Sequence, residues 1–382
     1  MSIINKTLKS LLVVLIFASC SKPAIQDQNK QAIAPTKSSA TTTAQLRGAS
    51  TAPPKNVILM IGDGMGLTQI TAGMIANNNK LELERCTIVG LIKTSSSDDL
   101  ITDSAAGATA FASGIKTYNG AVGVDEHKNK VETIVEIAKR NNLSTALVAS
   151  SSITHATPAC FYAHQASRSL DEDIANDLLS SDVDIFMGGG SIFFTSRKDG
   201  RNLLNELKAK NYNIYNNVEK VSGKEDKVGV LLDGKQPAAK LKGRGEFLPN
   251  ATEKTLGLLQ NKNKGFFLMV EGSQIDWFGH SNSSDTLISE MIDFDNAIGK
   301  VLDFAEKDGE TLVIITADHE TGGYAIVGGD KSGKVMGKFS TGSHTATMVP
   351  VFAFGPGAEN FSGIYENTEI FHKIFNVWLL KD

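Results

Sequence analysis

The segment VILMIGDG, residues Val57–Gly64, indicates the fold class of this 382-residue chain. It opens with an unbroken apolar run, typical of a strand buried on both faces of a sheet, and then enters a Gly-Asp-Gly turn. Other apolar runs of the same kind are predicted to be strands: Leu143–Ala149, Phe266–Val270, Leu312–Thr316 and Val349–Phe354. Amphipathic stretches lie between them: Val131–Arg140, Leu170–Leu179 and Thr286–Glu306. This alternation predicts an α/β fold with a large central, mostly parallel sheet sandwiched between helices.

The first twenty residues have the pattern of an export signal. Lys6 and Lys9 precede the apolar run Leu11–Phe17, and small residues then lead to Cys20. A basic start, a short apolar stretch and small residues before a cleavage site are typical of such signals, and the run is too short to span a bilayer. Ala-Ser-Cys also resembles the bacterial lipoprotein box, so we expect a signal over residues 1–20 and lipidation of Cys20. Ordinary signal cleavage is the alternative.

The remaining chain divides by composition. Residues 21–55 are rich in Ser, Thr, Ala, Gln and Pro and lack apolar periodicity, which predicts a disordered tether. One domain is expected over residues 56–382, and within it residues 191–247, rich in Lys and Asn, are predicted to be the least regular part and a surface insertion. A formal net charge of only −4 excludes the strongly basic surface of a nucleic-acid-binding domain. Cys86 and Cys160 are read either as a pair or as small buried hydrophobes.

Acidic and histidine side chains follow several of the predicted strands. In open α/β sheets, ligands bind at the carboxyl ends of the strands, so these residues are candidates for a common site. Taken singly, each has an ordinary explanation as a turn residue, a helical i,i+4 pair or a loop histidine. Together they form a set of carboxylates and imidazoles suited to zinc. The set consists of Asp63, Asp276, His280, Asp318, His319 and His344.

Ser104 is the candidate nucleophile. It follows Asp103 and precedes a run of small residues, Ala105–Ala112, that predicts a helix beginning at the serine. An anion binds well at a helix start because of the free N–H groups and the positive end of the helix dipole. Helix capping by Asp103 or Ser104 is the structural alternative. The chain lacks a G-x-S-x-G elbow around Ser104, so a metal ion rather than a histidine would have to activate the hydroxyl.

These residues, in this order, resemble the signature of the alkaline phosphatase family. The resemblance runs from about Val57 to His372 and weakens in residues 191–247. It is carried by the Gly62-Asp63-Gly64 turn, Asp103-Ser104-Ala105, Thr157-Pro158, Glu271 with Asp276 and His280, Asp318-His319, and the loop with His344. The joint pattern is far more specific than any one of its members.

The resemblance implies a role for each matching residue. Ser104 would be the phosphorylated nucleophile. Arg168, expected on the helix after Thr157, would hold the phosphate with its planar fork. The structural alternative is a helix-surface arginine paired with an acid such as Asp171. One zinc ion would be bound by Asp276, His280 and His344. A second zinc ion would be bound by Asp63, Asp318 and His319. Asp63 would also contribute to a third site, normally occupied by magnesium, together with Thr157 and Glu271.

Two positions depart from the best-known bacterial pattern of this family. His155 stands where many bacterial members have Asp, and Trp277 stands where they have Lys. In the family these positions support the waters of the third metal and contact phosphate through water, so both are candidate substrate-binding residues. The same combination occurs in some marine and cold-environment members. The departure therefore indicates a subtype and leaves the identity of the third metal open.

The resemblance implies hydrolysis of phosphate monoesters to an alcohol and inorganic phosphate, through a phosphoserine intermediate assisted by two Zn²⁺ ions and one Mg²⁺ ion. Small phosphorylated metabolites would be the substrates, the enzyme would be periplasmic, anchored to the outer membrane or secreted, and a homodimer would match many family members. A phosphodiesterase of the same superfamily is one alternative, although Ser104 and Arg168 favour a monoesterase. A non-catalytic surface lipoprotein that binds zinc or phosphate is the other.

Overall fold

A computed structural model describes residues 52–378 and 380 of the chain. They belong to one compact unit, Arg47–Asp382. The expected export signal, Cys20 and the tether up to residue 51 lie outside the described residues, so these assignments remain predictions. No helix in the described part is long and apolar enough to cross a membrane.

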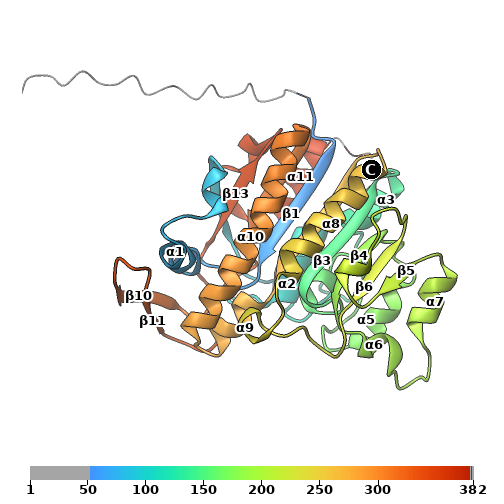
Figure 1. Cartoon of the computed structure of the whole chain (residues 1–382), viewed down its shortest axis with the longest axis horizontal. Helices are drawn as coiled ribbons and strands as arrows, with labels where there is room; N and C mark the ends of the chain where they lie inside the picture. Colours follow the sequence, from blue (N-terminus) through green and yellow to red (C-terminus); the bar gives the residue numbers. More distant parts are fainter. Residues whose placement is uncertain (1–51, 379, 381–382) are drawn as a thin grey trace, which may run out of the picture. The chain divides into compact units, whose positions relative to one another are not determined.

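The described residues form a central sheet of ten strands (Figure 1). Its order is β14 (Gly363–Glu366), β2 (Ile88–Lys93), β13 (Val349–Phe354), β8 (Thr311–Thr316), β1 (Asn56–Gly62), β7 (Phe266–Gly272), β3 (Ser144–Ser152), β4 (Ile185–Gly189), β6 (Val228–Leu231) and β5 (Asn213–Tyr215). Every neighbouring pair is parallel except for the two pairs made by β13, which runs antiparallel to β2 and to β8. The prediction of a large, mostly parallel sheet is confirmed.

Helices cover the sheet, and the central strands are therefore buried on both faces. The long helices α8 (Phe247–Asn261) and α10 (Ser284–Asp308) pack against each other and against the central strands (Figure 1). The other main helices are α1 (Leu67–Ala76), α2 (Ser104–Ser113), α3 (Ile134–Arg140), α5 (Asp171–Leu178), α7 (Leu203–Ala209) and α11 (Glu369–Trp378). Helix α3 begins later than the predicted stretch because Thr133 and Glu136 form a capping box at its start.

Residues 191–247 are more regular than expected. They contain α6 (Ile192–Thr195), α7 and the strands β5 and β6, which extend the central sheet at one edge. Strand β6 joins the sheet because its short apolar run is fully buried. The end of the segment is tied to α10 by Arg244, whose buried guanidinium pairs with Glu290 and with Asp293. Only part of this segment therefore matches the expectation of a surface insertion.

The sheet brings the candidate site together. Strands β8, β1, β7 and β3 are adjacent and parallel, so the segments that follow their carboxyl ends meet at one edge. Two short strands, β9 (Glu320–Thr321) and β12 (His344–Thr345), pair there and bring the His344 loop to the same place. The hairpin of β10 (Tyr324–Gly329) and β11 (Val335–Phe339) extends from this edge.

Candidate metal centre and active site

The first group of candidate ligands is Asp276, His280 and His344. Asp276 and His280 lie one turn apart on α9 (Gln274–His280), as the i,i+4 spacing predicts, and His344 begins β12. Asp276 Oδ1 lies 3.4 Å from Nε2 of each histidine, and the two Nε2 atoms are 3.0 Å apart. Both histidines donate Nδ1–H to a backbone carbonyl, at Gly342 and Thr102 respectively, each over 2.8 Å. Their Nε2 lone pairs are therefore free to bind a metal.

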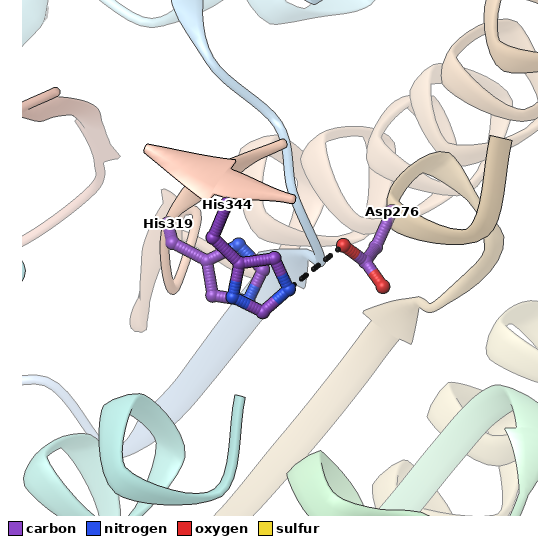
Figure 2. Close-up of side chains that lie close together, drawn as sticks. All are labelled: Asp276, His319 and His344. Atoms are coloured by element: carbon purple, nitrogen blue, oxygen red, sulfur yellow. Dashed lines mark ion pairs between the residues drawn. The ribbon is translucent and has the colours of Figure 1, made fainter. Parts of the chain in front are cut away.

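The second group is Asp63, Asp318 and His319. All three side chains are fully buried, with Asp63 directly after β1 and the other two after β8. His319 Nε2 lies 3.5 Å from Asp63 Oδ1 and 3.3 Å from Asp318 Oδ2. The His319 ring stacks on the His344 ring with 3.5 Å between centroids, so the first two groups adjoin (Figure 2). The two groups that the resemblance assigns to separate zinc ions thus lie side by side.

The third group contains Asp63, Glu271 and His155. Their ligand atoms all lie within 4.8 Å of one another. Asp63 is shared with the second group, as the resemblance implies. Thr157, the other expected member, lies on the short helix α4 (Ala156–Ala159) and is fully buried. His155, expected to support the metal only through water, is close enough to be a ligand itself.

The hydrogen bonding of these residues tests whether a cation fits. Several buried polar atoms in the second and third groups have no hydrogen-bond partner among the described residues. They are Asp63 Oδ1 and Oδ2, His155 Nδ1, Thr157 Oγ1, Glu271 Oε1 and Asp318 Oδ2. Buried polar atoms are nearly always satisfied, and one cation in each of the two groups would contact these atoms. The donor set therefore fits metal ions.

The pKa values of the carboxyl groups support the same conclusion. Burial, together with the charge of neighbouring carboxylates, raises the pKa of Asp63 well above its usual range and that of Asp318 to about 6. Burial raises the pKa of Glu271 to about 7. Burial acts in the same direction on Asp276, but His344 and the other histidines around it hold its pKa well below the usual range. Without cations, the carboxylates of the second and third groups are thus strongly disfavoured as charged species.

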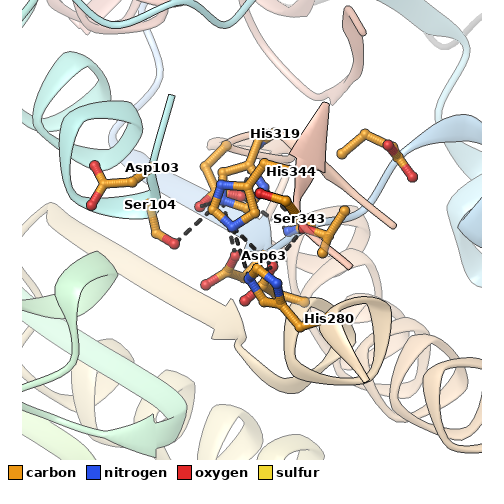
Figure 3. Close-up of polar contacts among 12 residues, drawn as sticks. Asp63, Asp103, Ser104, His280, His319, Ser343 and His344 are labelled. Atoms are coloured by element: carbon orange, nitrogen blue, oxygen red, sulfur yellow. Dashed lines mark hydrogen bonds and ion pairs between the residues drawn. The ribbon is translucent and has the colours of Figure 1, made fainter. Parts of the chain in front are cut away.

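Ser104 stands at the first position of α2, beside the ligands of the second group. Asp103 caps the helix, because its Oδ1 accepts the N–H of Ala106 over 2.9 Å. Ser104 Oγ lies 3.3 Å from His319 Nε2, so the hydroxyl points toward the buried ligands (Figure 3). The structure thus places Asp103 as the capping residue and leaves the hydroxyl of Ser104 directed into the site.

Arg168 reaches the site from a turn and not from a helix, which corrects the sequence-based expectation. Its segment is fixed by backbone contacts instead, since Arg168 N–H donates to Gly120 O over 2.8 Å. Its guanidinium donates a hydrogen bond to Asp103 Oδ2 over 2.9 Å. Asp171 accepts a hydrogen bond from Thr154 instead of from Arg168. The alternative of a helix-surface arginine paired with Asp171 is therefore wrong.

A cavity of about 440 Å³ opens above these residues. Its lining includes the serine, the arginine and ligands of the first group: Asp99, Ile101, Thr102, Asp103, Ser104, Asn119, Arg168, Asp276, His280, Ser343 and His344. The cavity can hold a small anion within reach of both Ser104 and Arg168. His155 and Trp277 contact each other edge to face, with 5.7 Å between ring centroids, outside this lining. Their contact with substrate remains a prediction.

Sequence reasoning missed three contributors. Asp103 binds Arg168 as well as capping α2, and Asn119 accepts the N–H of Asp103 over 2.9 Å. Thr321 contacts ligands of both the first and the second group. The local signals were the position of Asp103 next to Ser104 and that of Thr321 two residues after His319, and neither indicates these contacts by itself.

The fold and the site define a class: a metal-binding hydrolase with a serine at a helix start. Comparison with known proteins identifies the family. The family description "Alkaline phosphatase" matches residues 54–338. Alkaline phosphatase 4 of Bacillus subtilis is 36% identical, over 85% of this chain and 88% of its own length. Alkaline phosphatase of Escherichia coli is 32% identical, over 86% of this chain and 87% of its own. The chain belongs to the alkaline phosphatase family, and it is an enzyme that hydrolyses phosphate monoesters.

Solved structures agree with this assignment. Alkaline phosphatase from the Antarctic bacterium TAB5 is 48% identical and superimposes with a TM-score of 0.84, covering 87% of this chain and 100% of that one. A mutant of that enzyme, with a histidine changed to aspartate and Mg bound in the M3 site, gives the same values. Thermus thermophilus alkaline phosphatase, 22% identical with a TM-score of 0.80, shares the fold. The predicted fold, a large and mostly parallel sheet between helices, is therefore confirmed.

Proposed function

We propose that this chain hydrolyses small phosphate monoesters through a phosphoserine at Ser104, with two zinc ions and a third ion, normally magnesium, in the three ligand groups. The observation that carries the proposal is the convergence of unsatisfied buried carboxylate atoms next to the Ser104 hydroxyl. When bound, the metals would lower the pKa of coordinated hydroxyl groups and stabilise negative charge on entering and leaving oxygens. The likeness to a mutant of the TAB5 enzyme, with a histidine changed to aspartate and Mg bound in the M3 site, supports a third metal site in this chain.

In the proposed reaction, Ser104 is the nucleophile of the first step and the leaving group of the second. Ser104 Oγ forms a bond to phosphorus while the ester oxygen leaves with the bonding pair and takes a proton to become the alcohol. Water next attacks the phosphoserine, phosphate leaves, and Ser104 regains its hydroxyl proton. The start of α2 places the positive end of a helix dipole beside the transferred group. These steps make Ser104 the point at which the substrate is both captured and released.

Arg168 holds the oxygens that do not react. Burial lowers its pKa, but Asp103 outweighs that effect and raises the pKa above its ordinary value, so the guanidinium is charged throughout the working range. Asp103 binds one N–H of the fork and leaves others free for two phosphate oxygens. The geometry thus favours a monoester dianion over a diester, in which one of these oxygens carries a second ester group.

Phosphoserine formation provides the direct test. Zinc-loaded protein is incubated with radiolabelled phosphate, quenched in acid and digested, and the labelled peptide is identified by mass spectrometry. We expect label on Ser104 and none in Ser104→Ala. Ser113→Ala is a matched control, because it makes the same change at the other end of α2. Label on any residue other than Ser104 would refute the assignment.

Metal removal tests the cofactor. Treatment with a chelator should abolish phosphate release, and zinc with magnesium should restore it. Mass analysis of the restored protein should find two zinc ions per chain. Full activity after exhaustive chelation would refute the role given to the metals, and binding without phosphate release by the reloaded enzyme would favour a non-catalytic binding protein.

We further propose that the enzyme is exported and anchored through Cys20. The support is the basic start, the short apolar run Leu11–Phe17 and the Ala-Ser-Cys sequence. Mass spectrometry of the mature protein should then show a lipidated N-terminus at Cys20. A mature N-terminus elsewhere, without lipid, would instead indicate a free periplasmic or secreted enzyme.

A further inference from the structure

Thr321 lies between the first two ligand groups. It is the second residue of β9, two positions after the site residue His319, and its side chain is fully buried. Its Oγ1 donates a hydrogen bond to Asp276 Oδ1 and lies 3.2 Å from His319 Nδ1. One hydroxyl therefore contacts one ligand of the first group and one ligand of the second.

The direction of these two hydrogen bonds follows from counting hydrogens. A threonine hydroxyl has one hydrogen, and a carboxylate can only accept, so that hydrogen goes to Asp276. The oxygen can then only accept from His319, which requires that Nδ1 of His319 carries the ring proton. Nε2 of His319 is left with its lone pair, toward Asp63 and Asp318. The Ser104 hydroxyl, 3.3 Å from the same Nε2, can donate to it only in this tautomer.

His319 depends on this hydroxyl more than the other two histidines depend on their partners. His280 and His344 each face a backbone carbonyl, which accepts and never donates, so their tautomers are fixed by the main chain. A hydroxyl can donate or accept. It accepts from His319 only because Asp276 takes its hydrogen.

Packing holds Thr321 in this orientation. A Cβ atom added at Gly64 would lie 2.8 Å from Thr321 Oγ1, and one added at Gly279 would lie 2.8 Å from its Cγ2. Both glycines thus provide the space that the side chain fills. The main chain is held as well, since Thr321 N–H donates to Gly64 O over 3.3 Å and Thr321 pairs with His344 across β9 and β12. A β-branched side chain is restricted at χ1, and these contacts restrict Thr321 further.

We propose that Thr321 is a positioning residue, whose hydroxyl joins Asp276 to His319 and holds His319 in the tautomer that can bind a metal through Nε2. The inference rests on the proposed metal-binding function of these groups. It assigns to Thr321 the role that an orienting partner has for a metal-bound histidine: it fixes the ring and its tautomer. Loss of the hydroxyl should therefore weaken zinc binding without disturbing the shape of the pocket.

The test compares Thr321→Val with Thr321→Ser. Valine has nearly the same shape and lacks the hydroxyl, whereas serine keeps the hydroxyl and lacks the methyl group. Zinc binding to each metal-free protein is measured by titration against a chelator of known affinity, with phosphate release measured at saturating zinc. We expect Thr321→Val to lose roughly 10–100-fold in affinity for at least one zinc ion and Thr321→Ser to stay within about threefold of the unchanged protein.

Each outcome of this comparison decides the question. If Thr321→Val binds zinc as tightly as the unchanged protein, the proposal is overturned. If both variants lose the same affinity, it is also overturned, because the loss would then come from altered packing and not from the missing hydroxyl. If the unchanged protein binds no zinc, the proposed function fails instead. If Thr321→Val does not fold, the tautomer of His319 is measured instead, by nitrogen NMR of the metal-free, otherwise unchanged protein labelled at its histidines. The signal of His319 is assigned as the one that disappears in His319→Asn. A proton on Nδ1 of His319 supports the proposal, and a proton on Nε2 overturns it.

Discussion

Replacement of Arg168 by alanine should separate monoesterase from diesterase activity. The Arg168 side chain is 29% exposed and that of its partner Asp103 is 20% exposed, so the guanidinium acts in a partly desolvated site. A hydrogen bond to a charged group contributes about 1.5–3 kcal/mol, and a fork that grips two phosphate oxygens makes two of them. After allowance for the N–H already held by Asp103, about 3–5 kcal/mol remains. This corresponds to a loss of roughly 10²–10⁴ in kcat/KM for a monoester.

The assay uses one aryl phosphate monoester and its methyl diester with each protein. The diester lacks one of the oxygens that the fork would hold, so it should lose much less, and most of the preference for the monoester should disappear. Arg168→Lys keeps the charge without the fork and should fall between Arg168→Ala and the unchanged enzyme. Arg201→Ala is a matched control, because Arg201 is 41% exposed and pairs with Glu206 outside the cavity lining.

Equal losses on the two substrates would contradict the reasoning, because the fork would then not distinguish a monoester from a diester. No loss on either would remove Arg168 from the site altogether. Thermal unfolding of the metal-loaded proteins tests whether a loss of activity in Arg168→Ala comes from a loss of folded protein. The Arg168–Asp103 pair is partly exposed, so its removal should change the free energy of unfolding by only about 1 kcal/mol.

Two further results are expected. In the metal-free protein, the buried carboxyl groups of Glu271 and Asp318 should each contribute a loss of stability as pH rises, since their folded pKa values (about 7 and about 6) lie above their ordinary values of 4.5 and 3.8. Each contribution, roughly 3 kcal/mol, is complete below the ordinary pKa and is lost as pH rises to the folded pKa, whereas His155 and His319, whose pKa values burial lowers to about 3, act in the opposite direction below about pH 6.5. Thermal unfolding of the unchanged protein and of Glu271→Gln at about pH 4.5 and about pH 7 isolates the contribution of Glu271, and no gain of the variant over the unchanged protein across this interval would contradict it. Arg244→Ala should destabilise the fold by about 3–5 kcal/mol in urea unfolding, because it leaves Glu290 buried without its cation and Asp293 paired with Lys240 alone. A change below about 1 kcal/mol would show that the cluster relaxes.

The sequence predicted the centre of the fold well because the central strands are apolar on both faces. Runs such as Val57–Ile61 and Leu312–Thr316 carry that signal locally, and both are strands in the sheet. The edge was harder to predict. Strand β6 is a run of only four residues among Lys and Asn residues, and β5 is half exposed, so neither stands out from a loop. Strand β6 is placed by its pairing with β4, which is a long-range contact, and β5 by its pairing with β6.

The same distinction applies to the site. Asp63, Asp318 and His319 follow strands directly, so a rule about strand ends was sufficient to gather them. The structure brings Arg168 to Asp103 across 65 positions of sequence, through a turn that has no helical periodicity. Thr321 was invisible for another reason, since a threonine two residues after a histidine is ordinary until its neighbours in space are known. Sequence patterns thus identified the candidate ligands better than the groups that orient them.

The two described cysteines, Cys86 and Cys160, are both free and buried, so no disulfide joins parts of the described fold. The proposed ligands, in contrast, come from positions as distant as Asp63 and His344, and ions held there would close very long loops of the chain. Such loops restrict an unfolded chain most, and a bound ion closes them reversibly. A reducing agent should therefore leave the folded enzyme intact, whereas a scavenger of metals should loosen it. The supply of metal would then govern how long each molecule stays folded.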